Sequence, residues 1–497
     1  MIILVSIFLI NQRVLLLRFK VFNVGFFGDL EILINLWRFL FLIMVVLIRR
    51  RVIIFSFSYI RGLLVGNFIF LYLSFVISIL WLVLNNNFYW IIFGWDGLGV
   101  VSFILIVFYI NHERINNGLF TLFQNRVGDL FFVLFILGLI DLVIWDRVVV
   151  KWGLLFLICG ACVKSAQFPF NAWLLSAISA PTPISSLVHS STLVVAGVFI
   201  LLQFSYCLVD VLDVLKYISV ISLILRRVGL LNENDIKKLI AYSTIRHVSL
   251  IIYLLRFKLF KVVYFHLNIH AMFKSLIFIC FGFVILSSFH AQDKRLVRLL
   301  NLNPIIKIIY YFSCICLAGL PFLRAFFSKD FIIEKFIEFR LEFSFIILLM
   351  LFLRISIYYR FKLLKLTNVL YSYTIIEKRF LGLFGLVIIR VVIIRITNLF
   401  ITLVFRLRLE FLSFKIRIYV LVMIFILLRI YTNLNYKFNV YDKIKNFLEI
   451  WSVDFYALDK FIYWNMFLIL NYVRVLSNVK LFLLINWWVL LLAVIVF

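Results

Sequence analysis

The sequence predicts an all-α protein that crosses a membrane many times. Hydrophobic residues make up 66% of its 497 residues and charged residues 14%, whereas a soluble domain is nearer half apolar and a quarter charged. Apolar stretches long enough to cross a hydrocarbon core of ~30 Å recur along the chain, about 14 to 16 of them, with short polar gaps between. These runs lack the alternation of a membrane β-barrel. Because backbone groups in hydrocarbon must pair within the chain, we expect transmembrane helices.

The basic charge of the chain indicates membrane lipid rather than nucleic acid as a partner. A formal net charge of +28 would suggest nucleic acid in a soluble protein. In this chain many positive residues lie in gaps or at the ends of apolar segments, as at residues 49–51, 226–227 and 294–295. Such clusters usually mark the side of the membrane that stays in the compartment of insertion. They can also bind anionic headgroups, such as those of cardiolipin.

The two ends of the chain differ in character. Residues 1–65 are apolar from residue 2 and show neither a cleavable signal nor a transit pattern, so we expect retained N-terminal transmembrane helices. Residues 367–432 are expected to add C-terminal transmembrane helices. Residues 433–480 combine charged positions with apolar residues at helical spacing, which predicts a lateral amphipathic helix along the membrane or a neighbour. The apolar run 481–497 could anchor the end.

Two interrupted segments divide the middle of the chain. All five prolines fall between positions 169 and 321. Residues 164–170 and 319–330 each place a lysine within a few residues of a proline inside an apolar segment. Broken helices near the membrane midplane often mark the ion site of a transporter, and paired breaks indicate repeats. We therefore interpret 66–206 and 211–366 as two five-helix units with one discontinuous helix each. Prolines that only kink two helices for packing remain the alternative.

The first group of candidate site residues lies in the first unit. It comprises Asp96, then Arg126 and Asp129, which are three apart and share a helix face, and finally Lys164 and His189. An ionisable side chain inside an apolar helix costs about 2.5–3.5 kcal/mol on insertion scales, so it usually faces a protein interior or a wet cavity. Burial favours the uncharged forms of lysine and of carboxyl groups, which suits both to proton exchange near neutral pH. A static ion pair remains an alternative for Asp96.

The second group forms a stripe. His266, His270 and Lys274 lie at i, i+4 and i+8 and share one face of a helix. Two histidines and a lysine over ~12 Å of helix could pass protons through intervening waters. Lys329 and Asp330, at the second break, complete the group. A metal bound by the two histidines is the rival, but no acidic or cysteine residue lies beside them, so we expect no metal.

The cysteines do not predict a redox centre. Cys159 with Cys162, and Cys314 with Cys316, lie in apolar helical runs. An iron–sulfur cluster normally needs four cysteine ligands in a loop-rich setting. We expect this chain to bind no cofactor.

Six stretches carry a family resemblance over about residues 90–335. They are GWDGLGVVSF from Gly94, NRVGDL from Asn125, KSAQFPFNAWLLSAISAPTPISSLVHSSTLVVAG from Lys164, ENDIKKLIAYST from Glu233, HLNIHAMFKSLIFICFG from His266, and GLPFLRAFFSKDFIIE from Gly319. In these the sequence closely resembles the subunit 5 family of mitochondrial NADH:ubiquinone oxidoreductase (respiratory complex I), the antiporter-like subunits of its membrane arm. Outside these stretches the chain resembles the family only in its general apolar character.

The resemblance implies a fold and a set of roles. The fold would have about 14 core helices in two inverted repeats, with two discontinuous helices, a lateral helix and an anchor. The location would be the mitochondrial inner membrane, and the partners other membrane-arm subunits. Asp96 would be the acidic partner of Lys164, His189 the next relay residue, His266, His270 and Lys274 the central connection, and Lys329 with Asp330 the exit pair.

The chain departs from this family at two places. It has Arg246, His247, Val248 and Ser249 where the family often has Ser-Gln-Leu-Gly, and the role of His247 stays open. It also has Arg324, followed by alanine, where serine and glycine are usual. The added positive charge of Arg324 could raise the barrier for the exit step.

The hypothesis is proton translocation from the matrix to the intermembrane space. The chain would act as a subunit of the enzyme NADH:ubiquinone reductase and perform no redox chemistry, since it shows no Rossmann glycine pattern, flavin site or cluster ligands. NADH, flavin, iron–sulfur clusters and ubiquinone would bind elsewhere in the complex, and quinone reduction would drive the relay. Two alternatives remain: a cation/proton antiporter subunit of the same fold, and a purely structural subunit whose buried ions act in assembly.

Overall fold

A computed structural model describes residues 15–19, 30–60, 64–140, 147–205, 207–288, 292–293, 304–318, 329 and 332. All of them belong to the first of two compact units, Met1–Asp442. The predicted segments 367–432, 433–480 and 481–497 lie outside the described residues. So does most of the predicted second helix break, including Arg324 and Asp330.

A short hairpin precedes the first described helix. Strands β1 (Leu15–Phe19) and β2 (Leu30–Ile34) pair antiparallel. Arg18 lies opposite Glu31, and its Nε atom is 3.0 Å from the carboxylate Oε1. N-terminal transmembrane helices were expected in residues 1–65, and this range contains these two strands as well as a helix. A five-residue apolar run is too short to cross a bilayer as a helix, and cross-strand pairing satisfies its backbone groups instead.

Helix α2 (Leu36–Tyr59) is attached firmly at its start. The side chain of Asn35 accepts a hydrogen bond from the backbone N–H of Arg38 at 2.9 Å, which caps the helix. The buried guanidinium of Arg38 donates to the carbonyl oxygen of Leu84 at 3.0 Å and to Oδ1 of Asn86 at 3.1 Å. One cation thus joins the start of α2 to the end of the next helix.

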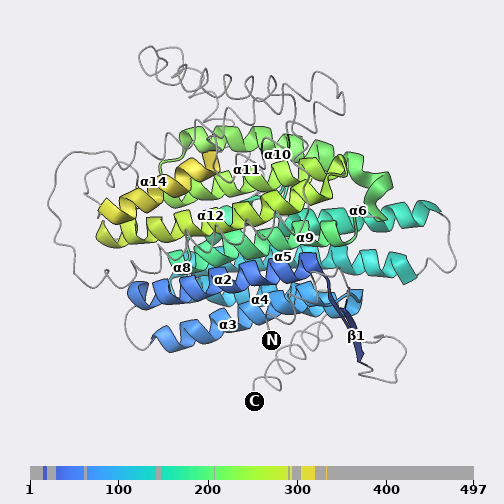
Figure 1. The fold of residues 1–497 in the computed structure, drawn as a ribbon, viewed down its shortest axis with the longest axis horizontal. Coiled ribbons are helices and arrows are strands. Elements are labelled where there is room, and N and C mark those ends of the chain that lie inside the picture. The colour runs from blue at the N-terminus through green and yellow to red at the C-terminus, as the bar shows by residue number, and fades with distance from the viewer. Residues whose placement is uncertain are drawn as a thin grey trace, which may run out of the picture. The chain divides into compact units, whose positions relative to one another are not determined.

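The first half of the described chain is a series of long apolar helices. Each packs against the next in sequence from α3 to α6, and Figure 1 shows these helices in blue to teal, lying side by side. Their bounds are α3 (Leu64–Leu84), α4 (Phe88–Val107), α5 (His112–Ile140) and α6 (Arg147–Lys164).

The first predicted helix break is present directly after Lys164. There α6 ends, Ala166 adopts a left-handed backbone with φ 53°, and the Phe168–Pro169 peptide is cis. The indole Nε1 of Trp173 donates to the carbonyl oxygen of Val163 at 2.9 Å and ties the two sides of the break together. Beyond it follow α7 (Ala172–Ala177), α8 (Thr182–Ile184), the π-helical turn η2 (Ser185–Thr192) and α9 (Leu193–Gln203).

The second half is built around α12. This helix (Phe260–Ser287) packs against α11, α14, η2 and α2, and Figure 1 shows it among the green and yellow helices. Its neighbours in sequence are η3 (Cys207–Val211), α10 (Leu212–Asn232), α11 (Ile236–Arg256) and α14 (Pro304–Ala318).

Six helices among the described residues are long and apolar enough to cross a bilayer. They are Leu64–Leu84, Phe88–Val107, His112–Gly138, Thr182–Gln203, Ile236–Arg256 and Phe260–Leu286. The last two are buried along most of their length, whereas α3, α4 and α5 each expose one side. Polar residues on α11 and α12 therefore face protein rather than lipid.

Candidate functional site

An ion-pair cluster joins α4 to α5. The guanidinium Nη1 of Arg126 lies 2.6 Å from Oδ1 of Asp96 on α4 and 3.4 Å from Oδ2 of Asp129, one turn along its own helix. One cation thus holds two carboxylates. The side chains of both aspartates are largely shielded from solvent, while that of Arg126 is 46% exposed.

Lys164 lies fully buried next to this cluster, at the end of α6. Its Nζ atom donates to the carbonyl oxygen of Trp95 at 3.3 Å and sits 5.1 Å from the centre of the Trp95 ring. The same indole donates from Nε1 to Oδ1 of Asp129 at 2.9 Å. Trp95 therefore contacts both the lysine and a carboxylate of the ion-pair cluster.

The two carboxylates of the ion-pair cluster do not pair directly with Lys164. Neither Asp96 nor Asp129 forms an ion pair with Lys164 within 4.0 Å in the described part of the chain. The resemblance makes Asp96 the acidic partner of Lys164, but the direct partner of Asp96 here is Arg126.

A glycine leaves space for the lysine head group. A Cβ atom placed on Gly99 of α4 would lie 3.3 Å from Nζ of Lys164 and 3.6 Å from Cβ of Asn125. Position 99 therefore has no room for a side chain unless Lys164 moves.

His189 is placed by its backbone alone. It lies in η2, which packs against α12 and continues into α9, and α9 in turn packs against α6. Its side chain lies outside the described ones. Through η2 and α9 the helix of Lys164 connects with the helix of the histidine stripe. A π-helical turn inside an α-helix is often found at functional sites.

The predicted stripe on α12 is buried along its length. His266 is 1% exposed, and His270 and Lys274 are 0% exposed. The ammonium group of Lys274 donates to the hydroxyl of Ser243 and, at 3.4 Å, to the carbonyl oxygen of Ile240, both on α11. Lys274 is therefore held by polar atoms of a neighbouring helix.

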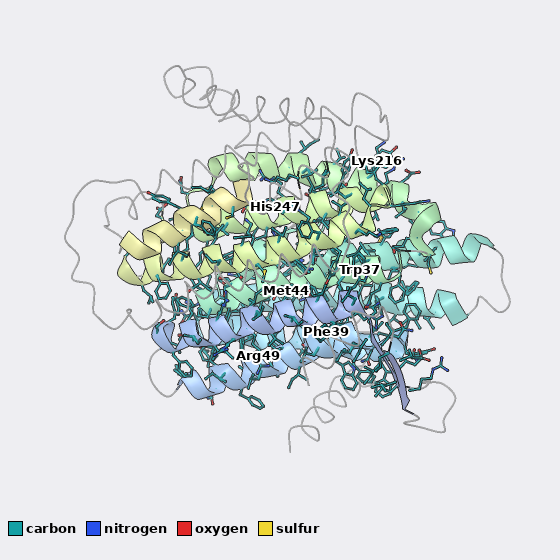
Figure 2. The ribbon with its side chains drawn as sticks, viewed as in Figure 1. Trp37, Phe39, Met44, Arg49, Lys216 and His247 are labelled. Carbon is teal, nitrogen blue, oxygen red and sulfur yellow. The ribbon has the colours of Figure 1, made fainter. Side chains whose placement is uncertain are left out.

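A third histidine lies against the stripe. The His247 ring, on α11, is 5.1 Å from that of His270 and 5.8 Å from that of His266, measured between ring centroids. Figure 2 labels His247 within the group of helices. Lys329 is 5% exposed. Asp330, its predicted partner, lies outside the described residues.

Several buried polar contacts in and near these two groups were not predicted from the sequence. Trp95 and Ser243 were not singled out, and neither was Lys237, which is 3% exposed and donates from Nζ to the carbonyl oxygen of Ala180 at 3.3 Å. A signal existed for Lys237, since a lysine one residue into a long apolar helix must find a partner. None existed for Trp95, because an apolar ring is expected in any apolar helix.

The described residues hold no group of three histidine, cysteine or acidic side chains arranged to bind a metal ion. Cys159 and Cys162 are not bonded to each other.

A family model described as the NADH:quinone oxidoreductase/Mrp antiporter transmembrane family matches residues 85–356. That range covers both parts of the site, from Asp96 to Lys329.

Curated relatives carry one name. The chain is 36% identical over 309 residues to NADH-ubiquinone oxidoreductase chain 5 of Anopheles arabiensis, a match covering 59% of this chain and 80% of that one. It is 37% identical over 283 residues to chain 5 of Locusta migratoria, a match covering 54% of this chain and 50% of that one. It is 36% identical over 302 residues to chain 5 of Lumbricus terrestris, a match covering 58% of this chain and 52% of that one. The match thus spans about half the length of the last two relatives.

Solved structures share the fold. A chain of the membrane-bound sulfane sulfur reductase, an archaeal respiratory membrane complex, superimposes with a TM-score of 0.68 at 19% identity, covering 78% of this chain and 85% of that one. A chain of the Mrp complex from Dietzia sp. DQ12-45-1b gives 0.64 at 22% identity, covering 72% and 43%. At these identities the likeness concerns the fold alone.

Proposed function

This chain belongs to the NADH:quinone oxidoreductase/Mrp antiporter transmembrane family, and we propose that it moves protons as a membrane-arm subunit of a respiratory NADH:ubiquinone oxidoreductase. The names of its relatives support this assignment. The location would be the mitochondrial inner membrane. Other membrane-arm subunits would be its partners, and anionic lipids such as cardiolipin would bind the basic clusters, including the one at residues 49–51.

The observation that carries the proposal is the buried stripe on α12. An apolar helix carries three ionisable side chains that are buried in the protein interior, those of His266, His270 and Lys274. Burying such groups is costly, and a helix that only packs would fill the same positions with apolar side chains. Imidazoles exchange protons near neutral pH, so the stripe suits proton transfer.

In this proposal the first group takes part in proton uptake. Lys164 would gain and lose a proton beside the ion-pair cluster of Asp96, Arg126 and Asp129. Protonation of Lys164 would be favoured by the nearby negative charge and opposed by burial. His189 would pass the proton towards α12.

The second group would complete the path. His266, His270 and Lys274 would connect the halves, and Lys329 with Asp330 would release the proton, with Arg324 raising the barrier there. The drive would come from quinone reduction elsewhere in the complex, by electrostatic or conformational coupling. NADH, flavin, iron–sulfur clusters and ubiquinone would act on other subunits.

A cation/proton antiporter is the second candidate, favoured by the Mrp part of the family description and by the fold shared with an Mrp complex chain. The purified full chain in vesicles separates the two. Sodium-dependent proton movement by the chain alone would favour the antiporter, and none is expected from a subunit that depends on quinone reduction.

The experiment that tests the relay against a structural role replaces Lys164 by alanine in the assembled complex. A relay predicts normal assembly with a lowered ratio of protons moved to electrons transferred, whereas loss of assembly would support a structural ion. Lys261→Ala is the control, because Lys261 is an exposed lysine on α12, and it should change neither quantity.

A further inference from the structure

We propose that His247 is a third proton-carrying histidine of the central stripe, placed across from His266 and His270. This inference rests on the proposed function and extends it to α11. The stripe predicted from sequence spacing lies on α12 alone, whereas the ring contacts of His247 join it from the neighbouring helix.

The geometry suits a bridge between the two α12 histidines. His266 and His270 are four residues apart, which separates them by ~6 Å along the helix. His247 contacts both rings, with centroids 5.8 and 5.1 Å away. An N–H···N hydrogen bond of ~2.9 Å between two imidazoles brings their centroids to about 5 Å. The His247–His270 distance therefore allows direct proton transfer after a ring rotation.

Helix α11 supplies a polar face along the whole stripe. Ser243 and His247 are four residues apart on α11 and share one side of it. Ser243 accepts from Lys274, and His247 contacts His270 and His266. Residue numbers therefore rise along α11 as those of their partners fall along α12. The resulting order is Lys274, His270, His247 and His266.

The charged groups around His247 favour transient rather than permanent protonation. Lys274 lies one turn beyond His270 on α12. Arg246, the preceding residue on α11, is also fully buried. Like charges repel strongly where solvent is excluded. A proton on the imidazoles between these cations would be released readily, as a carrier requires, and His247 itself is 0% exposed.

The test uses the assembled complex in sealed membranes. His247→Gln keeps a polar side chain of similar length but removes the ability to carry a proton. The ratio of protons moved to electrons transferred should fall below the wild-type value, with normal assembly and with Lys261→Ala unchanged. A wild-type ratio in His247→Gln, together with a lowered ratio in Lys274→Ala, would overturn this inference and leave the proposed function intact.

The remaining outcomes also decide whether His247 carries protons. If Lys274→Ala and His247→Gln both kept the wild-type ratio, the proposed function would fail and this inference with it. Should His247→Gln not assemble, His247→Asn offers a smaller amide at the same position. Failure of both amides to assemble would assign His247 to packing and overturn the inference. Assembly of His247→Asn with the lowered ratio would support it.

Discussion

The ammonium group of Lys274 on α12 donates a hydrogen bond to the hydroxyl of Ser243 on α11. The contact joins residues that are 31 positions apart in sequence and both fully buried. It fixes the alignment of α11 with α12 at one end of the histidine stripe. The hydroxyl accepts from the ammonium and donates to the carbonyl oxygen of Ile240 at 2.6 Å, because it carries one donor and two acceptor sites.

Ser243→Ala should lower proton transfer without preventing assembly. The change leaves Lys274 with the Ile240 carbonyl but without its side-chain acceptor, at a cost of about 1–3 kcal/mol for a buried polar group. Proton uptake by sealed membranes during NADH oxidation measures the effect. Ser249→Ala is the matched control, since the Ser249 hydroxyl bonds only to a carbonyl of its own helix. Equal rates in the two variants would count against the role of Ser243.

Trp95→Phe should impair the first group by removing one hydrogen bond while keeping an aromatic ring beside Lys164. The lost donor is the indole Nε1, which holds Oδ1 of Asp129. We expect a lowered proton-to-electron ratio in the assembled complex. Trp152→Phe, at a position 59% exposed, should leave the ratio unchanged. A wild-type ratio in Trp95→Phe would show that the indole does not position the carboxylate.

Gly99→Ala should displace the Lys164 head group. The added Cβ would meet Nζ at 3.3 Å, closer than most carbon contacts, so the lysine head group must shift by a few tenths of an ångström. The expected result is reduced proton translocation with assembly preserved, measured in the same membranes. Gly66→Ala controls for the loss of a helical glycine, because its Cβ would meet nothing within 4 Å. Unchanged translocation in Gly99→Ala would mean that Lys164 tolerates displacement.

Arg38→Ala should destabilise the fold rather than the chemistry. It leaves the Leu84 carbonyl and the Asn86 side chain without their buried cationic donor, a loss of about 1.5–3 kcal/mol. The temperature at which half of the assembled complex is lost on heating should fall. Arg18→Ala should have a smaller effect, since the Arg18 side chain of this ion pair is 63% exposed and surface ion pairs contribute about 0–1 kcal/mol. Equal midpoints would contradict the attachment described for α2.

Features set by spacing along one helix could be predicted from sequence. The positions of His266, His270 and Lys274 share a face because 3.6 residues complete a turn, and the lysine beside a proline marked the break after Lys164. Contacts between helices could not be predicted in this way. His247 and Ser243 lie on the side of α11 that faces α12, and that choice depends on how the two helices pack.

The hairpin of β1 and β2 was missed for a related reason. Short apolar runs are compatible with either helix or strand, and the pairing of Arg18 with Glu31 becomes visible only when the strands are aligned. The contact of Trp95 with both Lys164 and Asp129 likewise needs three helices in place.

The most direct test of the account is the proton-to-electron ratio of the assembled complex carrying Lys274→Met. Methionine keeps an unbranched chain of similar length in the buried site and removes the exchangeable proton. Complex assembly and NADH oxidation are measured on the same membranes, with Lys261→Met as the exposed control on the same helix. The account predicts normal assembly, a lowered ratio for Lys274→Met and a wild-type ratio for Lys261→Met. An assembled Lys274→Met complex that moved protons at the wild-type ratio would contradict it.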